Sequence, residues 1–206
     1  MSVLLCSEIL IAIYRFLPLL QNRLYMAKLY INKDIVADKD KMENWYLTGE
    51  EGLSFPDIQN FLSWIDPNDH VIDIEIHSCG GDAVEGYAIY DALRASGKQI
   101  SCTAVGRCAS MATVILLAAA KERRFAYPHA KFLIHKPYMA SYDGDLDLET
   151  LESIKSNLES EKNKMLALYV ERTGSEASVI EAQMNKAGWF GGETAKQLGF
   201  ITTVLM

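Results

Sequence analysis

From residue 26 onward, short strand-like runs alternate with helix-like runs, and this order limits the possible folds more than any other feature of the sequence. Residues 71–76 (VIDIEI) alternate apolar and polar side chains, as a half-buried strand does. Residues 54–65 and 147–173 carry apolar side chains at helical spacing. We expect strands at 28–31, 71–76, 99–105, 124–127, 131–135 and 200–205, and helices at 54–65, 82–96, 110–120, 147–173, 178–185 and 193–198. The alternation predicts an α/β fold with a largely parallel sheet.

The size and composition of the chain indicate one globular domain, which we place at residues 26–206. Half of the 206 residues are apolar, and 27 acidic residues outnumber 20 basic ones, giving a net charge of −7. An acidic chain is a poor candidate for non-specific nucleic-acid binding, which depends on basic residues. The four cysteines include no CxxC pair. We therefore expect reduced thiols in a cytoplasmic protein, with no structural metal site.

Residues 1–25 form a separate N-terminal extension. Residues 3–20 are rich in apolar side chains, but Glu8, Arg15 and Pro18 interrupt them, so a membrane span is not expected. A basic region and small residues before a cleavage site, which mark a signal peptide, are lacking. The segment is either an amphipathic helix that packs on the body or on a partner, or an extension that is absent from the native product. We hypothesise that Met26 is the biological start.

Two motifs stand where a strand passes into a helix. Gly80 and Gly81 follow the strand at 71–76, and Asp82 with Glu85 has the spacing of a capping box. The glycines can form a simple tight turn, or they can leave backbone N–H groups free to stabilise a negative charge. Ser110 follows a strand and begins an apolar helix. It is either an N-cap or a nucleophile with small neighbours.

His135 ends the apolar strand at 131–135, just before Pro137. It is either a core residue or a general base at a strand terminus, where the sites of open α/β sheets lie. His70, His77 and Cys79 have no spacing typical of a metal site. Cys108 is interpreted as a small buried residue, because nothing near it predicts a lowered thiol pKa.

Taken together, these segments resemble the proteolytic subunit of the Clp protease family, the ATP-dependent serine peptidases. The resemblance covers about residues 29–204. It depends on five motifs in the family's order: IHSCGG (76–81), IYD (89–91), GRCASM (106–111), FLIHKP (132–137) and AKQLGF (195–200). The sequence between the motifs is most similar to short Clp-like proteases of prophages and gut bacteria, some of which act in capsid maturation.

The resemblance implies a ClpP/crotonase-like α/β fold of repeated ββα units, with the helix at 147–173 as a long projecting handle helix. It implies Ser110 as nucleophile, His135 as general base, and the N–H groups of Gly81 and Met111 as the oxyanion hole. It also implies a homo-oligomeric ring that encloses protein or peptide substrates, with an AAA+ unfoldase or capsid proteins as further partners. It implies no cofactor, no nucleic acid and no membrane.

The chain departs from the family at the third residue of the catalytic triad. The family has an aspartate where this chain has Ala187. Asn185 or a residue from elsewhere then orients His135, or the enzyme works with Ser110 and His135 alone, or it is weakened. Two alternatives to an active protease stay open: a catalytically weakened or inactive ring subunit, and an acyl-CoA hydratase or isomerase of the crotonase fold.

Overall fold

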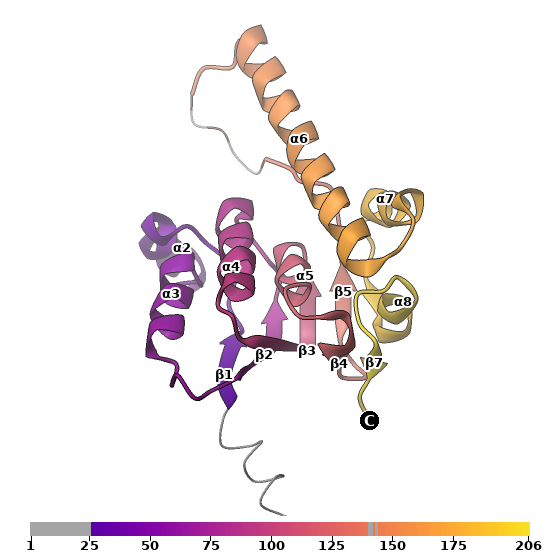
Figure 1. Ribbon diagram of the computed structural model, residues 1–206. Helices are drawn as coiled ribbons and strands as arrows, with labels where there is room; N and C mark the ends of the chain where they lie inside the picture. Colours follow the sequence, from indigo (N-terminus) through magenta and orange to yellow (C-terminus); the bar gives the residue numbers. More distant parts are fainter. Residues whose placement is uncertain (1–25, 140–141, 143) are drawn as a thin grey trace, which may run out of the picture.

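The computed structural model describes residues 26–139, 142 and 144–206 (Figure 1). The N-terminal extension and its expected helix therefore lie outside the described residues. The elements are, in chain order, β1 (Met26–Ile31), η1 (Asp38–Asp40), α2 (Lys41–Thr48), α3 (Phe55–Trp64), β2 (Val71–Ser78), α4 (Ala83–Ala95), β3 (Gln99–Ala109), α5 (Met111–Leu116), η2 (Lys121–Arg123), β4 (Arg124–Ala126), β5 (Lys131–Leu133), α6 (Leu148–Thr173), α7 (Ala177–Lys186), β6 (Phe190–Gly191), α8 (Gly192–Gln197) and β7 (Thr203–Val204).

The sheet is almost entirely parallel, as the alternation of strands and helices predicts. Its main path runs β1-β2-β3-β4-β7, and every pair along it is parallel. The strand β5 also pairs with β3 in parallel, and β6 adds an antiparallel edge to β5. Parallel strands end at the same edge of a sheet, so residues that follow β2, β3 and β5 come together there.

The core lies between this sheet and the helices over it. Ile72, Ile74 and Ile76 are fully buried along β2, and all six residues of α5 are buried. In Figure 1, α3, α4 and α5 lie side by side over one face of the sheet. No described helix combines the length and the hydrophobicity that crossing a bilayer requires.

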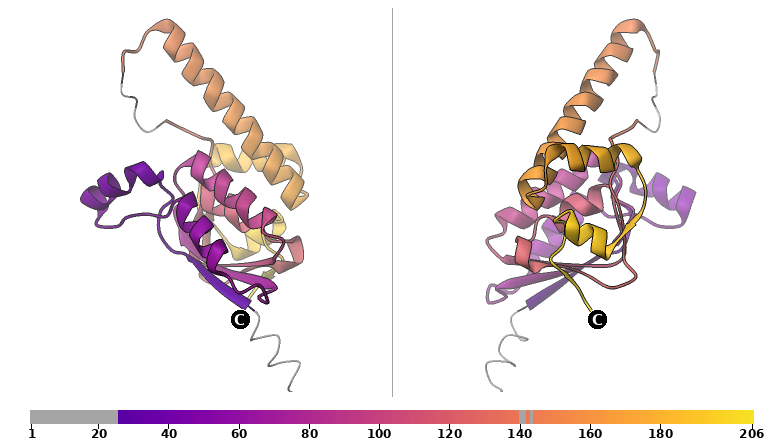
Figure 2. Two further views of the ribbon diagram at one scale, coloured as in Figure 1. Left: turned by 60° about the vertical axis from the view of Figure 1, so that its left-hand side comes forward. Right: turned by 90° about the vertical axis from the view of Figure 1, so that its right-hand side faces the viewer.

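The long helix α6 extends beyond the body, as predicted. Its buried residues are Met165, Tyr169 and Thr173, all of them in its C-terminal half. Asp147 caps its N-terminus by accepting a hydrogen bond from the Thr150 N–H, and Gly174 ends it in the left-handed conformation. The N-terminal half therefore stands clear of the sheet (Figures 1 and 2).

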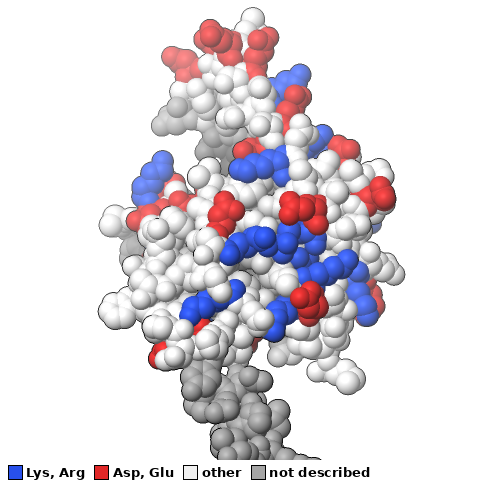
Figure 3. All heavy atoms as spheres, viewed as in Figure 1, with Lys and Arg blue, Asp and Glu red and all other residues white. Residues whose placement is uncertain are grey.

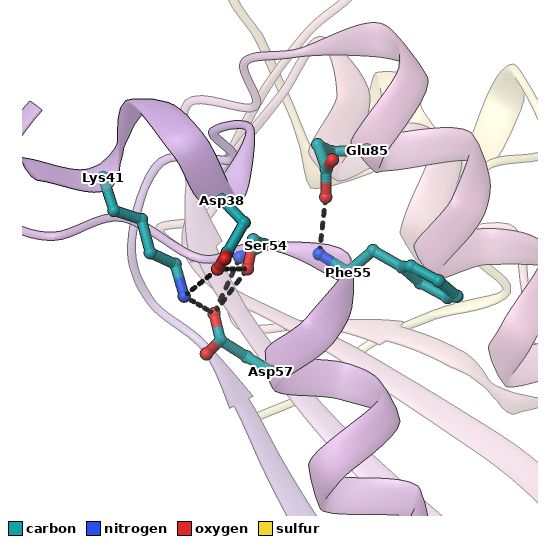
Figure 4. A network of polar contacts seen from close by, with 6 residues as sticks. All are labelled: Asp38, Lys41, Ser54, Phe55, Asp57 and Glu85. Carbon is teal, nitrogen blue, oxygen red and sulfur yellow. Dashed lines mark hydrogen bonds and ion pairs between the residues drawn. The ribbon is translucent and has the colours of Figure 1, made fainter.

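The segment between β1 and α3 contains two short helices that the sequence pattern did not predict, η1 and α2. The helix α2 has no buried residue and stands away from the sheet in Figure 2. A polar network fixes the base of this segment (Figure 4). The Lys41 Nζ donates to Asp57 at 2.7 Å, and Ser54 forms a capping box with Asp57 at the start of α3. The Phe55 N–H donates to Glu85 of α4 at 2.6 Å.

Some predicted boundaries were wrong. The helix expected at 110–120 ends at Leu116, and the short helix η2 follows it. The strand expected at 99–105 continues to Ala109, directly before Ser110. Of the strand expected at 200–205, only Thr203–Val204 pairs, while Phe200 and Ile201 are buried in the core.

Candidate active site

Ser110 occupies a strained turn between β3 and α5. Its backbone has φ 52° and ψ −125°, and Ala187 is the only other non-glycine residue with positive φ in the described part of the chain. Such a conformation costs on the order of 1–3 kcal/mol and persists only where the surroundings enforce it. Here the Ser110 N–H donates to the Leu133 carbonyl at 2.8 Å, and Thr113 Oγ1 donates to the Ser110 carbonyl at 2.6 Å.

The Ser110 side chain does not cap α5. It makes no side-chain cap hydrogen bond, although Ser110 stands at the N-cap position. The residue is half-buried, and its hydroxyl has no hydrogen-bond partner among the described residues. This finding weighs against the N-cap interpretation, because a capping serine accepts a hydrogen bond from the first turn of its helix.

Gly80 lies directly against this turn. A Cβ atom added to it would stand 2.5 Å from the Ala109 carbonyl oxygen, 2.7 Å from the Met111 nitrogen and 2.8 Å from the Ser110 Cβ. Its φ of 86° also favours glycine. Gly80 and the Ser110 turn therefore pack backbone to backbone, which needs a residue without a side chain at position 80.

The two backbone N–H groups expected to form an oxyanion hole are Gly81 and Met111. The Ile35 N–H donates to the Gly80 carbonyl, and the Asp82 N–H donates to the Ile35 carbonyl. Both hydrogen bonds of this bridge therefore use the neighbours of Gly81 and not its own N–H. Within the described residues, no hydrogen bond takes up the N–H of Gly81 or of Met111. Both donors are thus available to a ligand, and the contact of Gly80 with the Met111 nitrogen brings the two segments together.

His135 reaches the same edge of the sheet from β5. Ala109, the last residue of β3, is in register with Leu133, the last residue of β5. Ser110 comes one residue after Ala109, and His135 comes two residues after Leu133. Both residues therefore leave neighbouring parallel strands at their carboxyl ends. Among the described residues, Ser110 Oγ has no hydrogen-bond partner, so the structure places the hydroxyl and the imidazole at one edge without joining them. Catalytic hydrogen bonds are often long in unliganded enzymes.

The imidazole of His135 has a partner that the sequence did not predict. Its Nδ1 lies 2.6 Å from the carbonyl oxygen of Lys136. A carbonyl oxygen can only accept, so Nδ1 carries a proton, and in the neutral imidazole Nε2 is then the unprotonated nitrogen. The ring is half-buried and lies beside the Tyr138 ring, with centroids 5.5 Å apart. No sequence signal could have shown this contact, since every residue has a carbonyl.

A pocket of about 520 Å³ adjoins the imidazole, and His135, Asn185 and Ala187 all line it. Ala187 ends α7 with φ 47°. No carboxylate occurs among the described residues of this lining. Asn185 faces the same pocket, but the hydrogen bond of Nδ1 goes to Lys136. An orienting role for Asn185 stays a prediction.

Cys108 is buried, as predicted, and is not an alternative nucleophile. Its exposed fraction is 0%, and burial raises the pKa of its thiol well above the ordinary value. A thiol that does not ionise is a weak nucleophile. Cys79, Cys102 and Cys108 are all free thiols, whereas Cys6 lies outside the described residues.

Comparison with known proteins identifies the class and then the family. The structure resembles that of a ClpP1 point mutant from Listeria monocytogenes, with a TM-score of 0.69 over 92% of this chain and 95% of that one, at 20% sequence identity. The chain therefore has the ClpP/crotonase-like α/β fold, as predicted. The sequence model of the Clp protease family matches residues 57–206.

Curated relatives agree with the family model. The chain is 30% identical over 149 residues to the ATP-dependent Clp protease proteolytic subunit 1 of Chlamydia abortus, covering 70% of this chain and 74% of that protein. It is also 30% identical over 152 residues to the ATP-dependent Clp protease proteolytic subunit of Porphyromonas gingivalis, covering 72% and 66%. The chain belongs to the Clp protease family. The resemblance seen in the sequence motifs is thereby confirmed.

Proposed function

We propose that this chain is a serine endopeptidase in which Ser110 is the nucleophile and His135 the general base. One observation carries the proposal. The strained turn at Ser110, whose side chain does not cap α5, lies against Gly80. Next to it, the N–H groups of Gly81 and Met111 make no hydrogen bond among the described residues. Membership of the Clp protease family supports hydrolysis of peptide bonds as the reaction. The structural framework alone would not assign it, because one fold hosts many activities.

The proposed mechanism uses the groups of this edge in order. His135 Nε2 takes the proton of Ser110 as Oγ attacks the scissile carbonyl. The N–H groups of Gly81 and Met111 hold the oxygen as it becomes negative. His135 then gives the proton to the leaving amine. Water repeats the sequence on the acyl-enzyme and releases the second product.

The Lys136 carbonyl supplies part of what the missing carboxylate would do. In a triad, the carboxylate holds the imidazole in the correct tautomer and stabilises the imidazolium that forms. The carbonyl 2.6 Å from Nδ1 serves the first role. As a neutral dipole it serves the second less well, so we expect turnover below that of a triad enzyme. Ser110 and His135 would then act as a catalytic dyad without a carboxylate as third member.

A second candidate is a weakened or inactive ring subunit that pairs with an active relative. Ala187 at the position of the family's aspartate favours it, and so does the lack of a hydrogen bond from Ser110 Oγ to His135 among the described residues. The two candidates differ in whether the hydroxyl of Ser110 reacts.

The experiment is labelling with a fluorophosphonate probe, read by intact mass. The wild-type chain should gain one probe adduct, and Ser110→Ala should gain none. Ser63→Ala serves as the matched control, since Ser63 is an exposed serine of α3, and it should label as the wild type does. Peptidase assay with a mixed peptide library then measures turnover. A wild-type chain that stays unlabelled at high probe concentration would exclude an active nucleophile and favour the second candidate.

We also propose a homo-oligomeric ring as the working form, with unfolded protein as the substrate. The relatives are named as subunits of ATP-dependent Clp proteases, which favours an AAA+ unfoldase partner over a role in capsid maturation. Co-purification of the native chain, followed by identification of bound proteins, tests this. Recovery with capsid or portal proteins would contradict it.

A further inference from the structure

A hollow rich in cations lies at the opposite end of the sheet from Ser110. It measures about 420 Å³, and it is formed where α4 and α6 end, where β3 begins, and around η2. Five of its ten lining residues are Lys or Arg, although the whole chain has only 20 among 206 residues. The cations are Arg94, Lys98, Lys121, Arg123 and Arg172, and the single carboxylate is Glu122.

Two of these cations, Arg172 and Lys121, donate hydrogen bonds to backbone carbonyls. Arg172 donates from Nε to the Leu117 carbonyl at 3.0 Å and from a terminal nitrogen to the Ala119 carbonyl at 2.9 Å. Lys121 Nζ donates to the Thr173 carbonyl at 3.1 Å. Cations at the C-terminal ends of helices are stabilised by the exposed carbonyls. These two side chains therefore have a structural role.

Arg94 and Arg123 have no such role. Among the described residues, neither guanidinium makes a hydrogen bond or ion pair, and Arg94 lies over the Tyr90 ring, 5.7 Å from its centroid. No ion pair of the described residues involves any of the five cations. The positive cluster therefore has one carboxylate, Glu122, in its lining and forms no ion pair among the described residues, in a protein whose overall charge is negative.

The buried Arg124 adds a further cation to this region. Arg124 follows the lining residue Arg123, is 1% exposed, and donates to the carbonyls of Ala119 and Arg172. Burial, together with the nearby charge of Arg172, lowers the pKa of Arg124 to about 10. An anion bound in the hollow would relieve this repulsion. In Figure 3, Lys and Arg side chains gather across the middle of the face shown, with several carboxylates among them, and further carboxylates lie at the far end of α6.

We propose that this hollow binds an acidic peptide segment of a partner protein. The cations come from three separate stretches of the chain, and a run of Asp and Glu side chains can pair with several of them at once. A single small anion would meet only some of them. The site lies away from the candidate active site and does not depend on the proposed function.

Fluorescence anisotropy with a labelled octaglutamate peptide tests the proposal. The full chain carries Ser110→Ala in every arm, so hydrolysis cannot affect the result. We expect binding at about 50 mM NaCl that weakens as salt increases. The double variant Arg94→Glu with Arg123→Glu should weaken binding by about tenfold or more, since each removes an attraction and adds a repulsion.

The matched control is Lys39→Glu with Lys155→Glu, two exposed lysines outside the hollow that give the same change in net charge. It should bind the peptide within about twofold of the parent chain. Equal loss in both double variants would show that only net charge matters and would overturn the proposal. No binding at the low salt concentration would overturn it too. So would displacement of the peptide by inorganic phosphate at an ionic strength where NaCl has no effect, because the hollow would then be a small-anion site.

Discussion

The backbone of Ser110 is held in place by buried neighbours on both sides. Ala109 and Met111 are buried, and the hydrogen bonds of Ser110 reach β5 and the first turn of α5. The strain of its positive φ is therefore offset by packing rather than by its own side chain. This leaves the hydroxyl free, which is the feature a nucleophile needs.

Gly80→Ala should damage both stability and reactivity. The new methyl group would overlap the Ala109 carbonyl and the Met111 nitrogen, and it would add strain at φ 86°. We expect a loss of about 3 kcal/mol in the free energy of unfolding, from strain plus overlap. Fluorophosphonate labelling of the remaining folded protein should also fall, because the Ser110 turn must move. Urea denaturation and intact mass measure the two effects.

Gly97→Ala separates strain from overlap. Gly97 has φ 70°, but a Cβ atom there would have nothing within 4 Å. We expect a loss of about 1 kcal/mol and unchanged labelling. If both alanine variants lost equal stability, close packing of Gly80 against the serine turn would not be the reason for glycine there.

The tautomer of His135 is a second prediction at this scale. The Lys136 carbonyl requires a proton on Nδ1, so neutral His135 should have an unprotonated Nε2. Long-range ¹H–¹⁵N NMR of histidine-labelled protein at about pH 8, where an ordinary histidine is neutral, distinguishes the two tautomers. Loss of one signal in His135→Gln assigns it. A proton on Nε2 would contradict the proposed base, since the free nitrogen would then face the carbonyl.

Among the elements, the start of α3 depends most on charge. Burial by itself would raise the pKa of Asp57, but the hydrogen bonds from Lys41 and Ser54 outweigh it and lower the pKa below its ordinary value. A lowered pKa means that the carboxylate stabilises the fold above about pH 4, and that this contribution is lost as the pH falls further. The network in Figure 4 should therefore weaken in acid.

Asp57→Asn tests that dependence. At neutral pH we expect the variant to be less stable by about 1 kcal/mol, the usual magnitude for a lost cap. The difference from the wild type should shrink between about pH 5 and about pH 3, as Asp57 is protonated. Urea denaturation across that range gives the curve. Asp40→Asn is the control, because Asp40 makes no side-chain cap at α2, and a similar pH trend in it would refute the assignment to Asp57.

At the scale of the whole molecule, the N-terminal half of α6, which has no buried residue, exposes apolar side chains that a partner subunit could cover. Leu148 is 80% exposed and Leu151 is 48% exposed on this half. In a ring assembly, this face would be buried against another subunit. Half a helix with exposed leucines and no fully buried residue is unusual in a monomer.

Leu148→Arg with Leu151→Arg should therefore reduce the oligomeric state. Mass photometry at several concentrations should show smaller species than the wild type forms, because each arginine would place a charge in an apolar contact. Ser153→Arg with Asn157→Arg adds the same charge to exposed polar positions of α6 and should leave assembly intact. Loss of assembly in both variants would indicate charge repulsion, and loss in neither would place the contact elsewhere.

Much of the fold could be predicted because burial leaves a local periodic pattern. The predicted strand at 71–76 and the predicted helices at 54–65, 82–96 and 147–173 closely match observed elements. The helix α2 was missed because Met42, Trp45, Tyr46 and Leu47 are all exposed, so its apolar residues do not mark a buried face. The two-residue strands β6 and β7 exist only through their pairing partners.

The sequence by itself determined the order of strands and helices, the family motifs and the candidate residues Ser110 and His135, because these depend on side-chain identity and spacing. Only the tertiary structure decided that Ser110 leaves its cap position unused and that Nδ1 of His135 meets the Lys136 carbonyl. It also decided that Arg94 and Arg123 gather with other cations around one hollow. The physical reason is that backbone carbonyls and surface charges are common along any chain, and only folding selects which of them become neighbours.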